Sequence, residues 1–304
     1  MNNFTASPQF SLSVHKYSNL IFKSILRTSS VRVESDSEIV IYTLLQHRSV
    51  CAYLLAIKSL VRFCKELNFA IVVQSDGTLT KEDCICLERH LNGIQILSRS
   101  SSEQYLATKL SGSQIDFLNR FKTPSLFVKF KLLNPLFRYK GRYLIVFDSD
   151  LLFLHPPEEV IRLLVRREKR VFHLPGGNNL STPFRRIGFG FSNVDISNFN
   201  AGFFGVPNEF SEADILEVLA RVREFDESLF CSWEMEQALW AVLLNAFRNP
   251  LNLGSIAPDY VGNGWRSYHE LKTRASIIHF VGTTRFRNLS YPLLGWQVIK
   301  SISK

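Results

Sequence analysis

The chain has 304 residues, of which 46% are hydrophobic and 21% are charged. This balance is that of an ordinary globular protein, so a fully disordered chain, a collagen and a coiled coil are excluded. Lys and Arg number 36 against 27 Asp and Glu, and the net charge of +9 favours an anionic partner. The 25 phenylalanines indicate a core rich in aromatic rings.

Most basic residues are scattered, and the one local run, at 162–170, indicates a solvated helix face or contact with an anionic membrane. The sequence has no arginine-rich arm, zinc-finger spacing or RNA-recognition signature, so no nucleic-acid partner is expected. It also has no apolar run of about 18 residues, so no transmembrane segment is expected, although peripheral membrane contact stays open. The five cysteines form no Cys-x-x-Cys pair and the start lacks a signal-peptide pattern, which favours a cytoplasmic protein with reduced thiols.

Residues 1–38 are rich in Ser, Asn and Thr and are expected to form an N-terminal extension, with at most one helix. After it, strands are expected over 39–45, 69–73, 94–97, 142–147, 203–206 and 276–281, helices over 50–63, 125–137 and 233–247, and a loop over 176–198. A further helix is expected to run through Leu91, with Thr80 as its N-cap and Asp83 three residues on, and another is expected to be opened by Pro156 and Pro157. Pro135 should end or kink the helix over 125–137. This alternation predicts an α/β fold with a largely parallel sheet.

The sharpest local feature is Asp148-Ser149-Asp150, which follows the apolar run 143–147. It therefore lies where a predicted strand ends, and in such sheets ligands bind beyond these ends. Residues two apart in an extended chain point to the same side, so both carboxylates converge on one point. A cation between them relieves their repulsion, and oxygen ligands suit a divalent metal. The alternative is a pair of solvent-facing loop acids.

Four segments together resemble a known family. The segment 143–154 is similar to the metal-binding segment of nucleotide-sugar glycosyltransferases with the GT-A fold, and most similar to glycosyltransferase family eight, the glycogenin-like enzymes. Further along the chain, 199–203 resembles the family's Asn-Ala-Gly element, 236–237 its acidic-Gln helix start and 279–285 its His-Phe-x-Gly-x-x-Lys element. The resemblance covers about residues 39 to 287, at these motifs only. It implies one GT-A domain over 39–304, with a mixed, mostly parallel sheet flanked by helices.

The resemblance also implies a site. The metal, Mn²⁺ or Mg²⁺, would be held by Asp148, Asp150 and His279, a mixed oxygen and nitrogen set that suits Mn²⁺ better than Ca²⁺. Glu236 and Gln237 would be the catalytic pair near the anomeric carbon of the sugar. With Gln46 and Asp76 added because they end the first two predicted strands, the expected donor-binding residues are Gln46, Asp76, Lys131, Asp148, Ser149, Asp150, Asn200, Gly202, Gly282 and Arg285.

Each of these assignments has an ordinary structural alternative. Lys131 matches the family's spacing better than Lys129, and either could lie on a solvated helix face. Asn200 and Gly202 could form a turn before a strand, Glu236 and Gln237 a first helical turn, and His279 could be a core residue. We expect His155, His173 and His269 to be structural or surface residues. The loops 176–198 and 258–268, with Tyr260 and Trp265, are candidates for acceptor contacts or ordinary capping loops.

The sequence thus predicts a metal-dependent glycosyltransferase that moves a hexose from a nucleoside-diphosphate sugar, expected to be a UDP-sugar, to an unknown acceptor (a glycan, protein, lipid or small molecule). The resemblance implies retention of the anomeric configuration. Two departures from the family favour an alternative, an inactive GT-A domain that binds a nucleotide sugar or glycan. Phe286-Arg287 replaces the family's Pro-Trp, and Ser49 falls near the place of the aromatic residue that stacks on the base. Arg285 stands where the family usually has Lys, and its guanidinium offers a bidentate contact instead. A nucleotidyltransferase is disfavoured because 45–49 contains no glycine.

Overall fold

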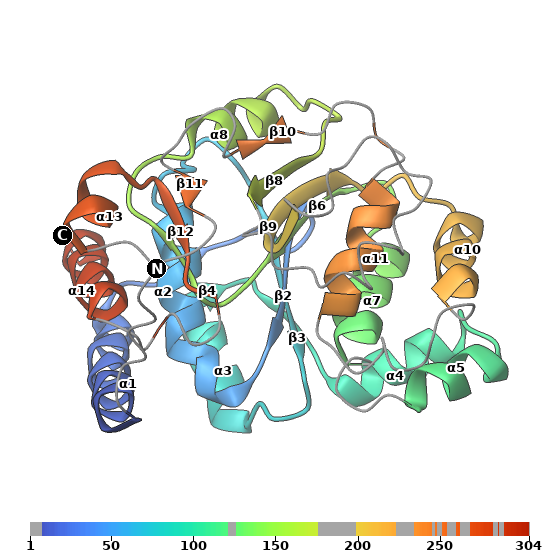
Figure 1. Cartoon of the computed structure of the whole chain (residues 1–304), viewed down its shortest axis with the longest axis horizontal. Helices are drawn as coiled ribbons and strands as arrows, with labels where there is room; N and C mark the ends of the chain where they lie inside the picture. Colours follow the sequence, from blue (N-terminus) through green and yellow to red (C-terminus); the bar gives the residue numbers. More distant parts are fainter. Residues whose placement is uncertain are drawn as a thin grey trace.

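A seven-stranded sheet runs through the centre of the molecule (Figure 1). The structure is a computed structural model and describes residues 8–120, 126–175, 199–222, 234–244, 247, 251–253, 260–261, 268–281, 285 and 289–303. In spatial order the strands are β10 (Leu251–Asn252), β8 (Phe172–Pro175), β9 (Phe199–Pro207), β6 (Tyr143–Phe147), β2 (Ile39–Leu45), β3 (Ala70–Ser75) and β5 (Gln95–Leu97). β2, β3, β5 and β6 are mutually parallel, and β9 is antiparallel to β6 and β8. The expected mixed, mostly parallel sheet is confirmed.

Two smaller sheets accompany it. β7 (Leu151–Phe153) pairs antiparallel with β12 (Ile277–His279), which is flanked in turn by β11 (Tyr260–Val261). β1 (Val31–Arg32) pairs in parallel with β4 (Leu91–Asn92). Because β7 follows β6 after only three residues, the end of β6 is also the junction between the central sheet and the sheet that contains β12.

Helices cover both faces of the central sheet (Figure 1). One face carries α1 (Pro8–Lys23), η1 (Ser24–Arg27), η2 (His47–Ser49), α2 (Val50–Val61), α3 (Lys81–His90), α8 (Glu158–Val165), α13 (Tyr268–Arg274) and α14 (Ser290–Ile302). The other carries α4 (Arg99–Ala107), α5 (Gly112–Asn119), the π-helical segment η3 (Val128–Leu133), α7 (Asn134–Arg138), α10 (Glu212–Val222) and α11 (Glu234–Leu244).

The strands are buried on both faces, as their composition requires. Along β6, Ile145 and Phe147 face the core on one side of the sheet, and Leu144 and Val146 face the core on the other. This is the period-two alternation of a strand in a sheet covered on both sides. The expected aromatic core is present, since Phe147 stacks on Phe153 at 6.0 Å between ring centroids.

The predicted cap of α3 is confirmed. Thr80 Oγ1 accepts the Asp83 backbone N–H at 3.2 Å, and Asp83 Oδ2 accepts the Thr80 backbone N–H at 2.8 Å. This reciprocal pair satisfies two amide donors that a helix start leaves without an intrahelical partner.

At Pro135 the helix neither ends nor breaks, and instead its hydrogen-bonding type changes from π-helical to α-helical just before the proline. The chain stays helical over 126–138, but η3 has π-helical bonding, and Pro135 sits in the first turn of α7. A π-helical bond would join the Phe130 carbonyl to the backbone nitrogen of residue 135, and proline has no N–H there. The Tyr42 hydroxyl takes this place and donates to the Phe130 carbonyl at 2.7 Å.

Several elements were not predicted. β7, β8, α4, α5, α10 and α14 are absent from the sequence-based assignment, and β9 begins at Phe199 instead of 203. The N-terminal helix α1 packs on α14, where the rings of Phe22 and Tyr291 lie 4.7 Å apart, and Ile21 and Ile25 join the main core. The boundary at residue 38 stays a prediction. In the part of the chain that the structure describes, no helix combines the length and apolarity needed to cross a bilayer.

Candidate active site

The Asp148-Ser149-Asp150 segment lies at the junction of the two sheets and is held at both ends. The Asp148 N–H donates to the Gly202 carbonyl at 2.8 Å, which continues the pairing of β6 with β9. The Asp150 carbonyl accepts the Phe280 N–H at 3.0 Å, which continues the pairing of β7 with β12. Ser149 is half-buried between them. Backbone bonds to strands distant in sequence therefore fix the direction of both carboxylates.

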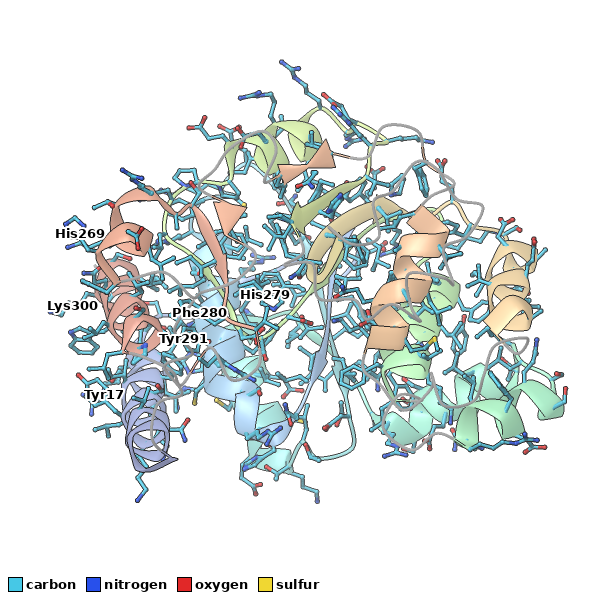
Figure 2. The ribbon with its side chains drawn as sticks, in the orientation of Figure 1. Tyr17, His269, His279, Phe280, Tyr291 and Lys300 are labelled. Atoms are coloured by element: carbon cyan, nitrogen blue, oxygen red, sulfur yellow. The ribbon has the colours of Figure 1, made fainter. Side chains whose placement is uncertain are left out.

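His279, at the end of β12, completes a cluster with these two acids. Its Nε2 lies 3.1 Å from Asp150 Oδ1 and 3.7 Å from Asp148 Oδ2, and one ligand atom from each of the three residues lies within 4.8 Å of the others. Figure 2 shows His279 at the centre of the molecule, between the sheet and the helices α2 and α14. The structure thus brings together the three residues predicted to hold a metal.

Asn200 sets the proton position on His279. Asn200 Oδ1 accepts the Gly202 backbone N–H at 2.8 Å, which identifies this atom as the amide oxygen, and His279 Nδ1 lies 2.9 Å from it. Nδ1 must then carry a proton and donate it to Asn200. In the neutral imidazole the lone pair of Nε2 consequently points at two carboxylates. Three acceptors that face one another in this way form a set of ligands for a cation, and the combination of oxygen and nitrogen donors fits Mn²⁺.

Gly202 leaves room for this histidine. A Cβ atom at position 202 would fall 2.0 Å from His279 Cε1 and 2.5 Å from His279 Nδ1, far inside van der Waals contact. The expectation was that glycine lets a substrate approach the backbone. In the structure the group that approaches it is the imidazole of His279.

Lys131 and Glu236 form the second half of the site. Lys131 Nζ lies 2.9 Å from Asp148 Oδ1 and 3.5 Å from Glu236 Oε2, and the side chains of Lys131 and Glu236 are only 7% and 4% exposed. Burial alone would lower the pKa of Lys131, but the carboxylates of Asp148 and Glu236 outweigh it and hold that pKa above its ordinary value. Lys131 therefore carries a positive charge between two acids.

The pKa values of two carboxyl groups in the site, Glu236 and Asp150, are shifted in opposite directions. Burial raises the pKa of Glu236 to about 7, even though Lys131 works against that shift. Burial also opposes ionisation of Asp150, but His279 and then Arg285 outweigh it, so the pKa of Asp150 lies below its usual range. Glu236 Oε1 is buried and makes no hydrogen bond of ordinary geometry within the described residues, although the nearby indole N–H of Trp240 favours the ionised carboxylate. The site thus contains an ionised carboxylate and a carboxyl group able to exchange a proton near neutral pH.

The structure separates Lys131 from Lys129. Residues two apart in a helix do not share a face. Lys129 accordingly points away from the acids and donates to Asn119 Oδ1 on α5, while burial lowers its pKa. Of the two candidate lysines, only Lys131 contacts the acid cluster in the described structure.

The remaining candidates lie around this centre. Gln237 is buried beside Glu236 at the start of α11, and its Nε2 donates to the Phe199 carbonyl of β9 at 2.9 Å. Arg285 Nε lies 3.7 Å from Asp150 Oδ2, so Arg285 faces the cluster as expected from the sequence. Gly282, the last predicted donor-binding residue, lies outside the described residues.

Gln46 and Asp76 stand at the ends of β2 and β3, on the same edge of the sheet as Asp148. Asp76 Oδ1 accepts the backbone N–H and the hydroxyl of Thr78, at 2.9 and 2.7 Å, and its own N–H donates to the Leu45 carbonyl. Gln46 Oε1 accepts a hydrogen bond from Arg48 Nε at 2.8 Å. These two side chains stabilise the turns after their strands, and their contact with a donor stays a prediction.

The other candidates from the sequence fall elsewhere. His155 and His269 are exposed, and His173 is buried with its Nδ1 2.8 Å from the Leu174 carbonyl, in agreement with structural or surface roles. The loop 176–198 and most of 258–268, including Trp265, lie outside the described residues. The four described cysteines, Cys51, Cys64, Cys84 and Cys86, form no disulfide with one another.

Sequence reasoning missed Tyr291 on α14. Its ring lies 4.3 Å from the ring of Phe280, the residue after His279. Its buried hydroxyl has no hydrogen-bond partner among the described residues, and burial, assisted by the charge of Asp150, raises its pKa. No local motif marks this tyrosine, because the contact depends on how α14 packs.

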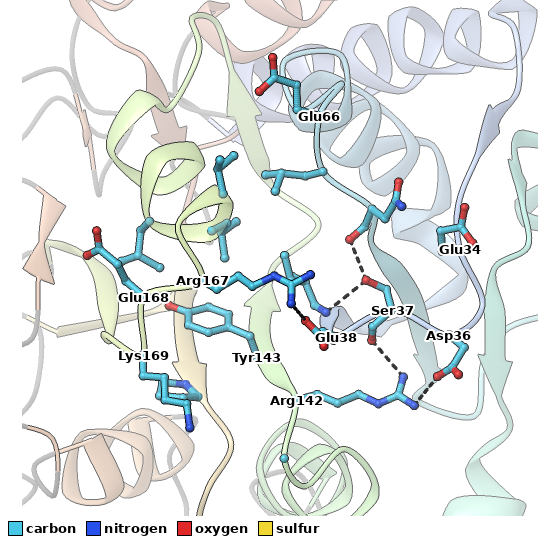
Figure 3. A pocket seen from close by; sticks show the side chains of 18 of the residues that line it. Glu34, Asp36, Ser37, Glu38, Glu66, Arg142, Tyr143, Arg167, Glu168 and Lys169 are labelled. Carbon is cyan, nitrogen blue, oxygen red and sulfur yellow. Dashed lines mark hydrogen bonds and ion pairs between the residues drawn. The ribbon is translucent and has the colours of Figure 1, made fainter.

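A cavity of about 640 Å³ lies at the other end of the strands, next to the starts of β2 and β6 (Figure 3). Ion pairs cross its walls: Arg142 Nη2 lies 2.5 Å from Asp36 Oδ1, and Arg167 Nη1 lies 3.1 Å from Glu38 Oε2. The carboxyl ends of the parallel strands face away from it. This cavity is therefore separate from the acid–histidine cluster.

Comparisons with known proteins agree with this geometry at the level of the fold. No protein-family model matches the sequence, and no curated protein gives a significant sequence match. Among solved structures, the galactosyltransferase LgtC, in complex with donor and acceptor sugar analogues, matches with a TM-score of 0.51 at 11% identity over 87% of this chain and 96% of its own. The glycosyltransferase GlyE of Streptococcus pneumoniae TIGR4 gives 0.48 at 16% identity, over 88% and 66%. The mannosyltransferase Ktr4p of S. cerevisiae gives 0.45 at 11%, over 81% and 77%. The likeness to the galactosyltransferase shows that this chain has the GT-A fold predicted from its sequence.

Proposed function

We propose that this protein is a metal-dependent glycosyltransferase that moves a hexose from a nucleoside-diphosphate sugar to an acceptor. The observation that carries the proposal is the cluster of Asp148, Asp150 and His279 at the carboxyl edge of a GT-A sheet. Ligands of open α/β sheets bind at this edge. The matched galactosyltransferase was solved in complex with donor and acceptor sugar analogues, which supports the same class of substrate.

Asp148, Asp150 and His279 are the residues that would hold Mn²⁺ or Mg²⁺. A divalent ion bound there would neutralise negative charge on the diphosphate leaving group. The backbone tethers of Asp148 and Asp150 keep their oxygens close together, and Asn200 keeps the lone pair of His279 Nε2 directed at them. Such partners behind the ligands fix the orientation on which metal affinity depends.

Lys131 and Arg285 supply positive charge, each to a different member of the acid pair. Lys131 contacts Asp148 and Arg285 approaches Asp150. When a diphosphate enters, both cations can share its charge in a site largely shielded from water, where such contacts are strong. The guanidinium of Arg285 offers a two-pronged contact to phosphate oxygens that a lysine in its place would not offer.

Glu236 and Gln237 would bind the transferred sugar. Glu236 Oε1 is a buried acceptor that makes no hydrogen bond of ordinary geometry within the described residues, and a sugar hydroxyl is a group that can donate to it. Lys131 links this carboxyl group to the metal side of the site through its contacts with Glu236 and Asp148. The sugar and the diphosphate would therefore lie on either side of Lys131.

Four finer points belong to the proposal: the sequence resemblance supports the donor and the retained configuration, and the cysteine pattern supports the location. The donor is a UDP-sugar, the anomeric configuration is retained, the acceptor is a glycan, protein, lipid or small molecule, and the protein acts in the cytoplasm. We assign no covalent nucleophile.

The test is thermal stability of the purified protein with a panel of nucleoside diphosphates and their sugars, with Mn²⁺ or with EDTA. A ligand that binds only the folded state raises the melting temperature. We expect a rise with one nucleotide family in Mn²⁺, and no rise in EDTA or in an Asp150→Asn variant. A wild-type protein that responds to none of these nucleotides in Mn²⁺ would contradict the proposed donor site.

A further inference from the structure

The helices α1 and α14 lie side by side at one edge of the molecule, on the left in Figure 1. Their outward faces carry large apolar side chains: Leu20 is 68% exposed, Tyr17 43% and Trp296 39%. Figure 2 shows Tyr17 and Lys300 on this same outer edge. We call this region the terminal-helix surface, made of Lys16, Tyr17, Leu20 and Lys23 on α1 and Trp296 and Lys300 on α14.

Basic and apolar residues are interleaved on the exposed face of α1. Lys16, Leu20 and Lys23 follow one another at intervals of four and three residues, so they share one side of α1, and Arg27 follows four residues later at the end of η1. All four are exposed, whereas Ile21 and neighbouring apolar residues on the opposite side join the core. Leu20, between two lysines on this face, is 68% exposed. Single exposed leucines are common, but a group of three large apolar side chains marks an interaction surface.

The charge of the protein is concentrated in the two stretches that build this surface. Residues 1–33 contain four Lys and Arg, residues 271–304 contain six, and neither stretch contains Asp or Glu. Residues 34–270 therefore hold 26 basic and 27 acidic residues, so they are almost neutral. The whole net charge of +9 originates from the two ends of the chain, whose helices pack together. Of these ten basic residues, Lys16, Lys23 and Lys300 belong to the terminal-helix surface, whereas Arg285 faces Asp150.

The side chains on α14 have the form that suits a water–lipid boundary. Lys300 Nζ lies 5.1 Å from the ring centroid of Trp296, so the aromatic ring and the ammonium group lie together. On the adjacent helix α13, Lys272 Nζ lies 5.9 Å from the ring of Tyr268. Aromatic rings with a polar edge favour the headgroup level of a bilayer, where lysines extend their charge toward lipid phosphates.

From these observations we propose that the terminal-helix surface docks on an anionic lipid bilayer. Leu20, Tyr17 and Trp296 insert at headgroup depth, and Lys16, Lys23 and Lys300 contact lipid phosphates. Charge and burial of apolar area act together in this mode of binding, as they do for amphipathic helices that lie in a membrane surface. The basic run at 162–170, the membrane candidate from the sequence, belongs to a different part of the fold, on and after α8.

Sedimentation with vesicles tests this docking directly. The full-length protein is mixed with vesicles of phosphatidylcholine alone, or of equal parts phosphatidylcholine and phosphatidylglycerol, at low and high salt. We expect binding to the phosphatidylglycerol vesicles that falls as salt screens the lipid charge. The double variant Leu20→Glu, Lys23→Glu should bind about tenfold less, because it reverses a charge and removes the most exposed apolar side chain.

A matched control makes the same two changes on another surface. Ile85, 64% exposed, and Lys81 lie on α3, so Ile85→Glu, Lys81→Glu alters charge and apolarity equally and should leave vesicle binding unchanged. Melting temperatures show that both variants are folded. The proposal is overturned if the wild-type protein binds both vesicle types equally or neither, or if both double variants lose binding equally. It is also overturned if the wild-type protein is a dimer that the α1 variant converts to a monomer while vesicles bind neither.

Discussion

The imidazole of His279 occupies the space in which a side chain at position 202 would lie. A Cβ on Gly202 would sit 2.0 Å from His279 Cε1, and the same histidine contacts Asp150 through Nε2 and Asn200 through Nδ1. A residue without a side chain, on a strand about 80 positions earlier in the chain, thus determines where the only nitrogen ligand of the cluster can be.

Replacing Gly202 with alanine should displace His279. We expect Gly202→Ala to lower the free energy of unfolding by about 1–3 kcal/mol, the usual cost of overpacking, and to abolish the rise in melting temperature with Mn²⁺ and a nucleoside diphosphate. Urea denaturation and thermal shifts measure the two effects. Gly112→Ala is the matched control, because a Cβ at Gly112 meets nothing within 4 Å. Its donor response should equal that of the wild-type protein. Equal responses in both variants would refute the steric argument.

Removing Lys131 should leave Glu236 and Asp148 without their shared cation. Lys131→Met is expected to cost about 3–5 kcal/mol of stability, because it breaks a buried ion pair on one side only. Adding Glu236→Gln removes one of the stranded acids and should restore part of that loss. Urea denaturation of the two single variants and the double variant measures the coupling. Strictly additive free energies, within about 0.5 kcal/mol, would show that Lys131 and Glu236 do not interact.

The buried carboxyl group of Glu236 gives stability a defined dependence on pH. Its pKa is about 7 in the folded protein against 4.5 ordinarily, so between these values the folded state keeps a proton that the unfolded state has released. The free energy of unfolding contributed by this group is therefore largest at low pH and falls as pH rises through the window. The difference between the wild-type protein and Glu236→Gln, measured in EDTA, should shrink by about 3 kcal/mol from pH 4.5 to pH 7. A constant difference across this range would mean that Glu236 titrates normally.

The hydroxyl of Tyr42 compensates for the missing N–H of Pro135 by donating to the Phe130 carbonyl. Tyr42→Phe should lower the free energy of unfolding by about 1–3 kcal/mol, because it leaves a buried carbonyl without a donor. Pro135→Ala restores a backbone N–H, so the same tyrosine substitution should cost less in that background. Chemical denaturation of the four proteins decides this. If Tyr42→Phe costs the same free energy of unfolding in both backgrounds, the Tyr42 hydroxyl does not compensate for the missing N–H of Pro135.

The parts of the site that follow local rules could be predicted from the sequence. β6 is a continuous apolar run, so the acids after it had to lie at the sheet edge. The four motifs led to His279, the family's spacing on the helix before the acids led to Lys131, and the structure brings both residues to the acids. The same reasoning could not separate Lys131 from Lys129 by more than spacing. That distinction depends on the direction of each side chain in η3.

The parts that depend on distant packing could not be predicted. The sequence Asn200-Ala201-Gly202 has the composition of a turn, yet it forms the start of β9 because β6 and β8 pair with it. Tyr291 lies beside the site because α14 packs against α1 and against Phe280, the residue after β12. The residues around Tyr291 in the sequence form no motif that would predict this position. The contacts that join α1 to α14 are likewise between residues far apart in the sequence, so no local sequence pattern predicts them.

The most direct test of the central claim is the release of nucleoside diphosphate from a panel of nucleotide sugars, in Mn²⁺ and in EDTA, by the wild-type protein and by Asp150→Asn. The proposed enzyme should release one nucleoside diphosphate in Mn²⁺ only, and the variant should lose this release while it keeps the fold. Release that persists in EDTA or in the variant would contradict the metal site. Binding of a nucleotide sugar with no release under any of these conditions would identify a binding domain instead of a glycosyltransferase.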